Sequence, residues 1–365
     1  MSENKKLLSI IVPSYNMEAY LPKCLRSLII DDKELLQRLD VIVVNDGSKD
    51  RTSAIAHEFE VKYPGVFRVI DKENGHYGSC VNVGLSSVQG LYVKVLDADD
   101  YVDTDVFCEF LVKLNLQINQ GVLADVFITD YCSVNQEGKI CSSSNYSFLP
   151  CNVFSMCDLN SLQSKSGVFI GLHAIFYRTE IFKLFRYKQT EGCCYTDTEW
   201  FSIPMAYAKN IQYFPMCVTQ YLVGREGQSM DPKVYARDFY VLCQIAVNMI
   251  KSFDSLNQNS SIDGKEYLSS RIIDLLSTIY HGTLFGVYGY NVNLDLDKFD
   301  RTLKELNKTF YIQLNNLKAP SKRFNFYYVK DWRDYHYRFK FISSIYKFYV
   351  ALIRFVKCFY NRDCR

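Results

Sequence analysis

The first hundred residues contain four short apolar runs, and each run ends in polar residues. Near-continuous apolar runs of this length are typical of parallel strands that are buried on both faces of a sheet. Helix-compatible segments follow the first three runs, as the crossover connections of a parallel sheet require. This alternation predicts an α/β fold with a mostly parallel central sheet flanked by helices. The expected strands are 7–12, 40–44, 67–70 and 93–96, and the expected helices are 19–30, 51–62 and 80–88.

Polar residues gather where three of these strands end. The carboxyl ends of the strands form the ligand crevice of an open α/β sheet, so we expect the three segments to share one rim. Asp46 can accept hydrogen bonds from a base or a ribose, and the glycine-containing second segment can offer backbone N–H groups to phosphate. Taken singly, the first two segments are also ordinary turn sequences. The segments are 45–50, 74–79 and 97–100.

The third segment, Asp97-Ala98-Asp99-Asp100, leaves a buried strand with three carboxylates. Alternate side chains of an extended chain share a face, so we expect Asp97 and Asp99 to point the same way. Two such oxygens suit a hard divalent cation that keeps open positions for phosphate. Asp-rich turns also cap helices, and Asp103 is a credible N-cap for the residues that follow it.

Composition and charge narrow the class of protein. A chain of 365 residues that is 48% hydrophobic can bury one large core or two units. A formal net charge of +2 gives no field suited to nucleic acid, so we expect no nucleic-acid partner. Thirteen scattered cysteines without CxxC spacing predict reduced thiols rather than a disulfide framework or a zinc site. The first apolar run is too short for a secretory signal, so a cytoplasmic location is expected.

The segment 131–235 carries a second pair of acids. Residues 124–130 and 171–177 read as strands, with a polar loop or hairpin over 132–147 between them. Asp197 and Glu199 precede an amphipathic helix, where acids favour the helix N-terminus whatever else they do. His173, on the second of these strands, is interpreted as a core or rim histidine.

From residue 236 onward the pattern is helical, and the last helix is basic and amphipathic. A repeat of seven aligns the basic residues on one stripe, and aromatic and aliphatic residues cover the opposite side. Lys347 and Arg354 would each cost about 2.5–3.5 kcal/mol inside a bilayer, so the helix is not expected to span one. Two alternatives stay open for 331–360, which are peripheral contact with a membrane surface and packing on protein. The basic residues of the stripe are Arg333, Lys340, Lys347 and Arg354.

Four ordered motifs together resemble the N-terminal half of family-2 inverting glycosyltransferases, which have the GT-A fold. The motifs are Ile11-Val12-Pro13-Ser14-Tyr15-Asn16, Val44-Asn45-Asp46-Gly47-Ser48, Asn74-Gly75 with Asn82-Val83-Gly84-Leu85, and Leu96-Asp97-Ala98-Asp99-Asp100. The resemblance implies a glycosyltransferase domain over 1–235, with a nucleotide-sugar-binding half (1–130) and an acceptor half (131–235), followed by a helical region over 236–365. Asn45 departs from the pattern, because the family often has an acid there.

The resemblance also implies roles for single residues. The donor would be a nucleotide-diphospho-sugar, and the acceptor a saccharide or a lipid-linked saccharide in polysaccharide biosynthesis. A divalent cation, Mn²⁺ or Mg²⁺, would bind Asp97 and Asp99. Asp197 would be the general base, with Glu199 as second choice, and Arg225 would contact the diphosphate. The other donor-binding residues would be Pro13, Tyr15, Glu18, Asp46, Asn74 and Gly75.

Other classes fit less well. A phosphotransferase of the haloacid-dehalogenase type expects Thr or Val two residues past the second acid, where this chain has Tyr101. A dinucleotide oxidoreductase needs a GxGxxG turn after the first strand, where this chain has Pro13-Ser14-Tyr15-Asn16. A non-catalytic nucleotide-sugar-binding or scaffolding module, tethered at the inner face of the membrane, remains the alternative.

Overall fold

The computed structural model describes residues 5–168, 170–225, 227–229, 231–287, 290–318 and 327–336. The chain divides into two compact units. The first comprises Met1–Glu226 with Ser252–Leu268, and the second comprises Gly227–Lys251 with Ser269–Arg365.

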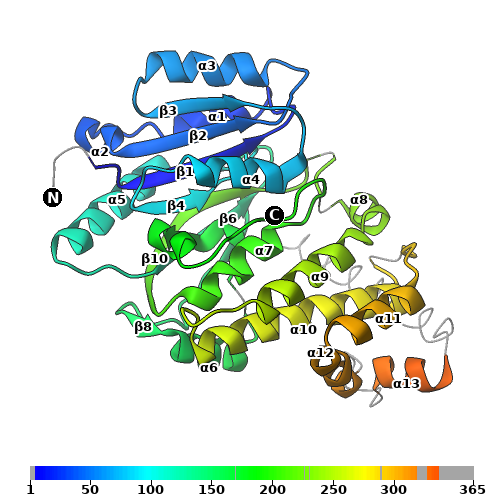
Figure 1. The fold of residues 1–365 in the computed structure, drawn as a ribbon. Coiled ribbons are helices and arrows are strands. Elements are labelled where there is room, and N and C mark those ends of the chain that lie inside the picture. Colours follow the sequence, from blue (N-terminus) through cyan, green and yellow to red (C-terminus); the bar gives the residue numbers. More distant parts are fainter. Residues whose placement is uncertain are drawn as a thin grey trace, which may run out of the picture. The chain divides into compact units, whose positions relative to one another are not determined.

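The first unit is built on a ten-stranded sheet. Eight of its strands lie in the order β3-β2-β1-β4-β9-β6-β10-β5, and the other two are β7, which pairs with β6, and β8, which pairs with β10. β1 pairs in parallel with both β2 and β4, β2 pairs in parallel with β3, and β6 with β10. The parallel pairing predicted from the apolar runs is therefore confirmed over β3-β2-β1-β4, whereas the whole sheet is mixed, because β5, β7, β8 and β9 pair antiparallel with their neighbours (Figure 1). The strands are β1 (Leu8–Ser14), β2 (Leu39–Asn45), β3 (Phe67–Asp71), β4 (Tyr92–Val95), β5 (Tyr101–Val102), β6 (Val126–Val134), β7 (Ile140–Ser144), β8 (Phe154–Ser155), β9 (Ile175–Arg178) and β10 (Asn210–Leu222).

Helices cover this sheet because alternate strand residues point to opposite faces. Ile10 and Val12 of β1 belong to a core that includes apolar residues of α1 and α5. Ile11, on the other face, meets α4, where a Cβ added to Gly84 would lie 2.5 Å from the Ile11 Cγ2 atom. The helices of this unit are α1 (Leu21–Ser27), α2 (Lys33–Gln37), α3 (Thr52–Lys62), α4 (His76–Ser86), α5 (Thr104–Asn119), α6 (Met156–Ser166) and α7 (Asp197–Ser202).

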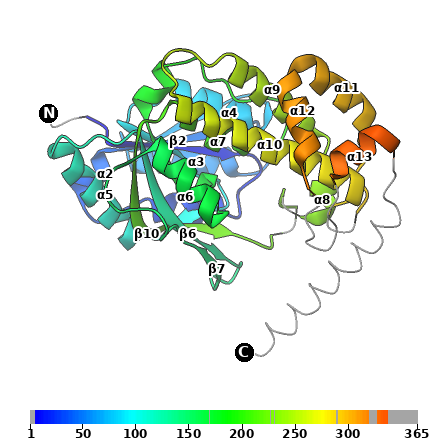
Figure 2. The same cartoon turned by 90° about the horizontal axis from the view of Figure 1, so that it is seen from below.

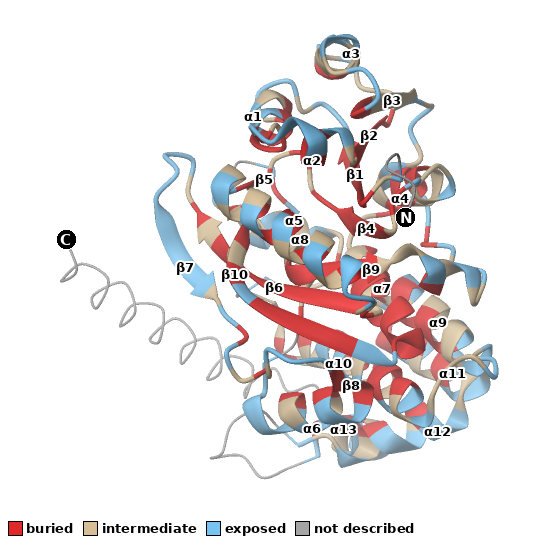
Figure 3. Cartoon of the chain, turned by 90° about the vertical axis from the view of Figure 1, so that its left-hand side faces the viewer, coloured by how far each residue is buried: buried red, intermediate tan, exposed pale blue. Residues whose placement is uncertain are grey.

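Several predicted elements differ at their ends. α4 begins at His76 rather than at residue 80, directly after the Asn74-Gly75 turn. The strand expected over 171–177 opens with a 3₁₀ turn, Leu172–Ala174, before β9. The polar stretch after residue 131 forms a β6–β7 hairpin. A hairpin was one of the two structures expected for 132–147, the other being a loop. Figure 2 shows β7 extending beside β6, and Figure 3 shows that β7 is exposed whereas β6 and β10 are mostly buried.

One pair of cysteines departs from the expectation of reduced thiols. Cys132 of β6 and Cys217 of β10 form a disulfide, with their Cα atoms 6.3 Å apart. The two residues are 85 positions apart in the sequence, and only the pairing of β6 with β10 brings them together. A scattered cysteine pattern carries no sign of such a contact. The expectation of a free thiol is therefore wrong for this pair.

The described part of the second unit is helical. α9 and α10 have residues in both units, and the other helices belong to the second unit alone. Among the residues that the structure describes, none of the helices combines the length and apolar character that a membrane crossing needs. The helices are α8 (Pro232–Arg237), α9 (Val241–Asp254), α10 (Ile262–Phe285), α11 (Leu296–Leu306), α12 (Lys308–Gln313) and α13 (Tyr328–Tyr335).

Arg333, the first basic residue of the predicted stripe, packs on protein, which was one of the two alternatives for this segment. Its guanidinium is 8% exposed, and its Nε and Nη2 atoms bond Asp300 at 2.9 and 2.6 Å. Its Nη1 atom donates to the Tyr311 carbonyl and to the Asn315 side chain. α13 ends at Tyr335, because His336 takes a left-handed conformation with φ of 49°. The rest of the predicted membrane helix, 337–360, lies outside the described residues.

Replacing Arg333 with Met should destabilise the second unit by about 3–5 kcal/mol, because it leaves Asp300 buried without its partner. Arg301→Met is the matched control, since Arg301 is an exposed arginine on α11. Urea denaturation followed by circular dichroism measures both variants. Equal midpoints for the two variants would mean that Arg333 is a surface residue in energetic terms.

Candidate active site

The loops that follow β1, β2, β3 and β4 lie at one edge of the sheet, as predicted. Asp46, after β2, is 2% exposed, and its Oδ1 atom accepts from Lys72 Nζ at 2.5 Å and from the Gly75 amide at 2.9 Å. The Asn74 side chain donates to the Asp46 carbonyl at 3.0 Å. Asp46 therefore holds the loop between β3 and α4 against the end of β2. Tyr77, at the start of α4, donates to Asp97 at 2.8 Å and joins this loop to the end of β4.

The loops after β1 and β2 are bonded to each other reciprocally. The Glu18 carboxylate accepts from the Arg51 amide at 3.0 Å, and the Glu18 amide donates to Asp50. Pro13 is buried, whereas Tyr15 is 43% exposed. Of these predicted donor contacts, Tyr15 offers an exposed ring, whereas the Glu18 carboxylate is already bonded to the backbone just before α3.

Asn45 has a physical reason to depart from the family pattern. Its Nδ2 atom donates to Asp71 at 2.7 Å, and its Oδ1 atom accepts from the Ser48 amide at 3.2 Å. A carboxylate at this position would face the Asp71 carboxylate, and like charges at this distance repel. The uncharged amide of Asn45 can therefore donate to the Asp71 carboxylate on β3 without charge repulsion.

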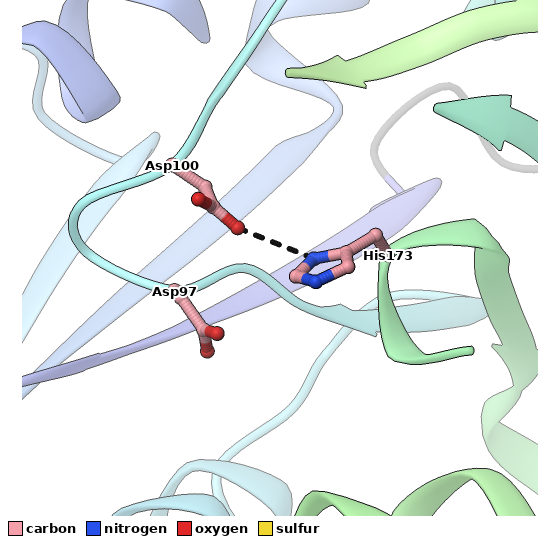
Figure 4. A group of neighbouring side chains, drawn as sticks. All are labelled: Asp97, Asp100 and His173. Carbon is pink, nitrogen blue, oxygen red and sulfur yellow. Dashed lines mark ion pairs between the residues drawn. The ribbon is translucent and has the colours of Figure 1, made fainter. Parts of the chain in front are cut away.

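The acids after β4 do not stay extended. The Asp100 amide donates to the Asp97 carbonyl at 2.9 Å, so the chain turns, and side chains no longer alternate between two faces. Asp97 is grouped with Asp100 and His173, and one ligand atom from each lies within 4.8 Å of the others (Figure 4). Asp99 lies instead against Arg225, whose Nε and Nη2 atoms are 2.9 and 2.8 Å from the Asp99 Oδ2 atom.

The pKa values of Asp97, Asp100 and His173 are shifted by burial and by neighbouring charges. Burial, together with the charge of Asp100, raises the pKa of Asp97 to about 7. Burial and then the charge of Asp99 raise the pKa of Asp100 well above its ordinary value. Burial lowers the pKa of His173 to about 4, so the imidazole is neutral near pH 7. Two carboxylates beside a neutral imidazole are a donor set that a divalent cation would neutralise.

Asp197 is the first residue of α7, and its charge acts on Tyr77, whose hydroxyl donates to Asp97. Burial, followed by the charges of Asp97 and Asp197, raises the pKa of Tyr77 well above its ordinary value. Burial also raises the pKa of Asp197 itself. The turn before α7 is formed by Tyr195 in a left-handed conformation with φ of 61°, which is uncommon for a bulky residue. Such backbone strain is found at functional sites.

Glu199, two residues further, has both carboxylate oxygens in use. It is 1% exposed, with Oε2 accepting from the Thr190 amide at 2.7 Å and Oε1 accepting from the Thr190 hydroxyl at 2.6 Å. Burial raises the pKa of Glu199 to about 7, and the two bonds from Thr190 oppose that rise. Glu199 therefore holds α7 onto the segment that precedes it.

The packing of residues 189–191 on α4 was not predicted from the sequence. The Asn82 side chain exchanges two hydrogen bonds with the backbone of Gln189 and donates a third to Glu191. A Cβ on Gly78 would lie 1.8 Å from the Thr190 carbonyl oxygen, so only glycine permits this approach. Asn82 inside the predicted helix and Gly78 just before it are the sequence signals that could have indicated close packing here.

Comparison with known proteins agrees with this architecture. Residues 9–185 match the model of Glycosyl transferase family 2. The glycosyltransferase GlyA of Streptococcus pneumoniae is 32% identical over 187 residues, which are 49% of this chain and 25% of GlyA. Chondroitin synthase of Pasteurella multocida is 32% identical over 136 residues, which are 37% of this chain and 13% of the synthase. The chain thus spans a quarter or less of the length of these two relatives.

Among solved structures, residues 1–349 of Staphylococcus aureus TarS in complex with UDP-GlcNAc align with a TM-score of 0.58 at 20% identity. The alignment covers 83% of this chain and 82% of the TarS chain. At this identity the likeness shows the fold, which is of the GT-A type with added C-terminal helices. Residues 9–185 therefore match glycosyl transferase family 2, which is the family that the four motifs resemble.

Proposed function

We propose that the chain is an inverting glycosyltransferase that moves a sugar from a nucleotide-diphospho-sugar to an acceptor hydroxyl. The observation that carries this proposal is that Asp97 bonds Tyr77 and Asp197 acts on the same side chain through its charge, in a chain whose residues 9–185 match glycosyl transferase family 2. The first acid comes from the predicted donor half, and the second from the predicted acceptor half. A transferase needs groups of these two kinds on the two sides of the reacting carbon.

The donor is assigned to the loops of the first half. The nucleoside would be received by Pro13, Tyr15, Glu18, Asp46, Asn74 and Gly75. Asp97 and Asp99 are the expected contacts of the cation and the diphosphate, and Arg225 already lies against Asp99. The crowded, buried oxygens of the group fit a hard divalent cation such as Mn²⁺ or Mg²⁺. When bound, such an ion would offset the charge that grows on the leaving diphosphate.

We assign the general base to Asp197 rather than to Glu199. Both oxygens of Glu199 accept hydrogen bonds from Thr190, which leaves it committed to structure. Asp197 is partly exposed, and burial raises its pKa toward the range that suits a base near neutral pH. It would take the acceptor's proton while the acceptor oxygen attacks the anomeric carbon opposite the leaving group. One such displacement inverts the configuration.

The acceptor is proposed to be a saccharide or a lipid-linked saccharide in bacterial polysaccharide assembly. The name of the Pasteurella relative, chondroitin synthase, supports this class. TarS was solved with UDP-GlcNAc, which makes UDP-sugars the first donors to test. Contact of residues 337–360 with the inner face of the membrane remains a prediction.

A screen of UDP- and GDP-sugars tests the donor assignment by thermal stabilisation, with and without Mn²⁺. At least one donor should raise the melting temperature only when the metal is present, because a bound cation would offset the negative charges of the protein carboxylates and of the diphosphate. Asp97→Ala should abolish the rise. Asp105→Ala, an exposed acid on α5, is the control that should keep it. A rise that is equal with and without the metal would overturn the cation assignment.

Replacing Asp197 with Asn should lower kcat about 10²–10⁴-fold, because the variant has no base for the acceptor hydroxyl. Glu199→Gln should change kcat less than tenfold, since glutamine can keep a hydrogen bond with Thr190. Initial rates of donor consumption and product formation measure both. Loss of turnover confined to the folded Glu199 variant would reverse the assignment.

The unfolding free energy should also depend on Glu199 between pH 4.5 and 7. The pKa of about 7 in the folded state lies above the ordinary glutamate value of 4.5, so the folded state binds the proton more tightly. The stabilisation is therefore complete below pH 4.5 and is lost as the pH rises through 7, by about 2–3 kcal/mol. Urea denaturation at several pH values should give a steeper decline for the native protein than for Glu199→Gln. Parallel curves would mean that Glu199 ionises normally.

A further inference from the structure

We propose that His173 and Asp100, together with Asp97, form the cation site, and that His173 supplies a nitrogen ligand from the acceptor half. The inference rests on the proposed function only for the role of the bound ion. The resemblance assigns the cation to carboxylates after β4 and gives His173 no part. The structure adds an imidazole from the turn before β9.

The spacing of the three residues fits one ion. Their ligand atoms lie within 4.8 Å of one another. Ligands about 2.0–2.5 Å from a shared ion lie about 3 Å apart when adjacent and about 4–5 Å apart when opposite. The group therefore needs only small side-chain adjustments to close on a cation. Open positions would remain for the oxygens of a diphosphate.

Asp100 carries the second observation. Its Oδ1 atom accepts from the Leu222 amide at 2.9 Å. Its Oδ2 atom, on a side chain that is 0% exposed, has no hydrogen-bond donor among the described residues. This oxygen points at His173, with Nδ1 3.2 Å away (Figure 4). A buried carboxylate oxygen costs free energy unless it is paired, and a cation between the two side chains would pair it.

Neighbouring residues also hold the backbone and the ring of His173 in place. Its carbonyl oxygen accepts from Lys94 Nζ at 2.7 Å and from the Thr219 hydroxyl at 2.9 Å. Lys94 is 0% exposed on β4. The His173 ring stacks on Tyr221, with ring centroids 4.2 Å apart, and packs against Tyr131 at 5.2 Å. A ligand whose backbone and ring are both fixed is organised before the ion arrives.

The binding of Mn²⁺ alone to the full-length chain tests the inference without any turnover. Isothermal titration should give a dissociation constant at least tenfold higher for His173→Phe than for the native protein. Phenylalanine keeps the stacking on Tyr221 and removes the nitrogen. His57→Ala, which changes a histidine at the other end of the rim, should leave the constant unchanged.

A spectroscopic measurement separates ligation from packing. Electron spin echo modulation of bound Mn²⁺ should carry a nitrogen signal in the native protein and in His57→Ala, and should lose it in His173→Phe. A nitrogen signal that persists in folded His173→Phe, or that is absent from the native complex, overturns the inference. A native protein that binds no Mn²⁺ overturns it as well.

The outcomes for metal and for transfer are independent. If the nitrogen signal depends on His173 while no sugar nucleotide is consumed, the cation site stands and the proposed transferase function fails. If transfer is measured while the nitrogen signal does not depend on His173, the function stands and this inference fails.

Discussion

The site depends on the close approach of the segment 189–192 to α4. Asn82 bonds the backbone of Gln189 in both directions, and the missing side chain of Gly78 lets the Thr190 carbonyl lie against the helix. Glu199 then ties α7 to Thr190. Asp197 lies in the first turn of that helix. Its position therefore depends on contacts made by Asn82, Gly78 and Glu199, to which no chemical role is assigned. The acceptor half is in this way oriented by the donor half's own helix.

Negative charge at the rim is the second constraint. Asp97, Asp99 and Asp100 stand within four consecutive residues, and burial makes each charge costly. The protein meets this cost with different partners: Tyr77 for Asp97, Arg225 for Asp99, and the Leu222 amide for one oxygen of Asp100. Lys94 adds a buried positive charge on the same strand, although burial lowers its pKa to about 7. The carboxylates thus retain a capacity for one more cation.

Much of the first half was predictable, because strand ends and helix connections follow from local pattern. The parallel order and the shared rim of Asp46, Gly75 and Asp97 are examples. The sequence misled where tertiary contacts decide. Asp99 was expected beside Asp97, but the turn closed by the Asp100 amide ends the alternation of side chains. For Arg333 the pattern left membrane contact and packing on protein open, and Asp300, thirty-three residues earlier, decides for packing. His173 drew no functional expectation, since its neighbours come from another half of the sheet.

Asn45 stands where the family often has an acid, and this difference affects which substitutions positions 45 and 71 can accept. The amide spans Asp71 and the Ser48 backbone, so the two side chains on neighbouring strands form one electrostatic unit. A mutation that restores an acid at 45 alone would place two carboxylates in contact, whereas a simultaneous neutral residue at 71 would remove the conflict. Substitutions at these positions should therefore be non-additive, and related sequences should covary there.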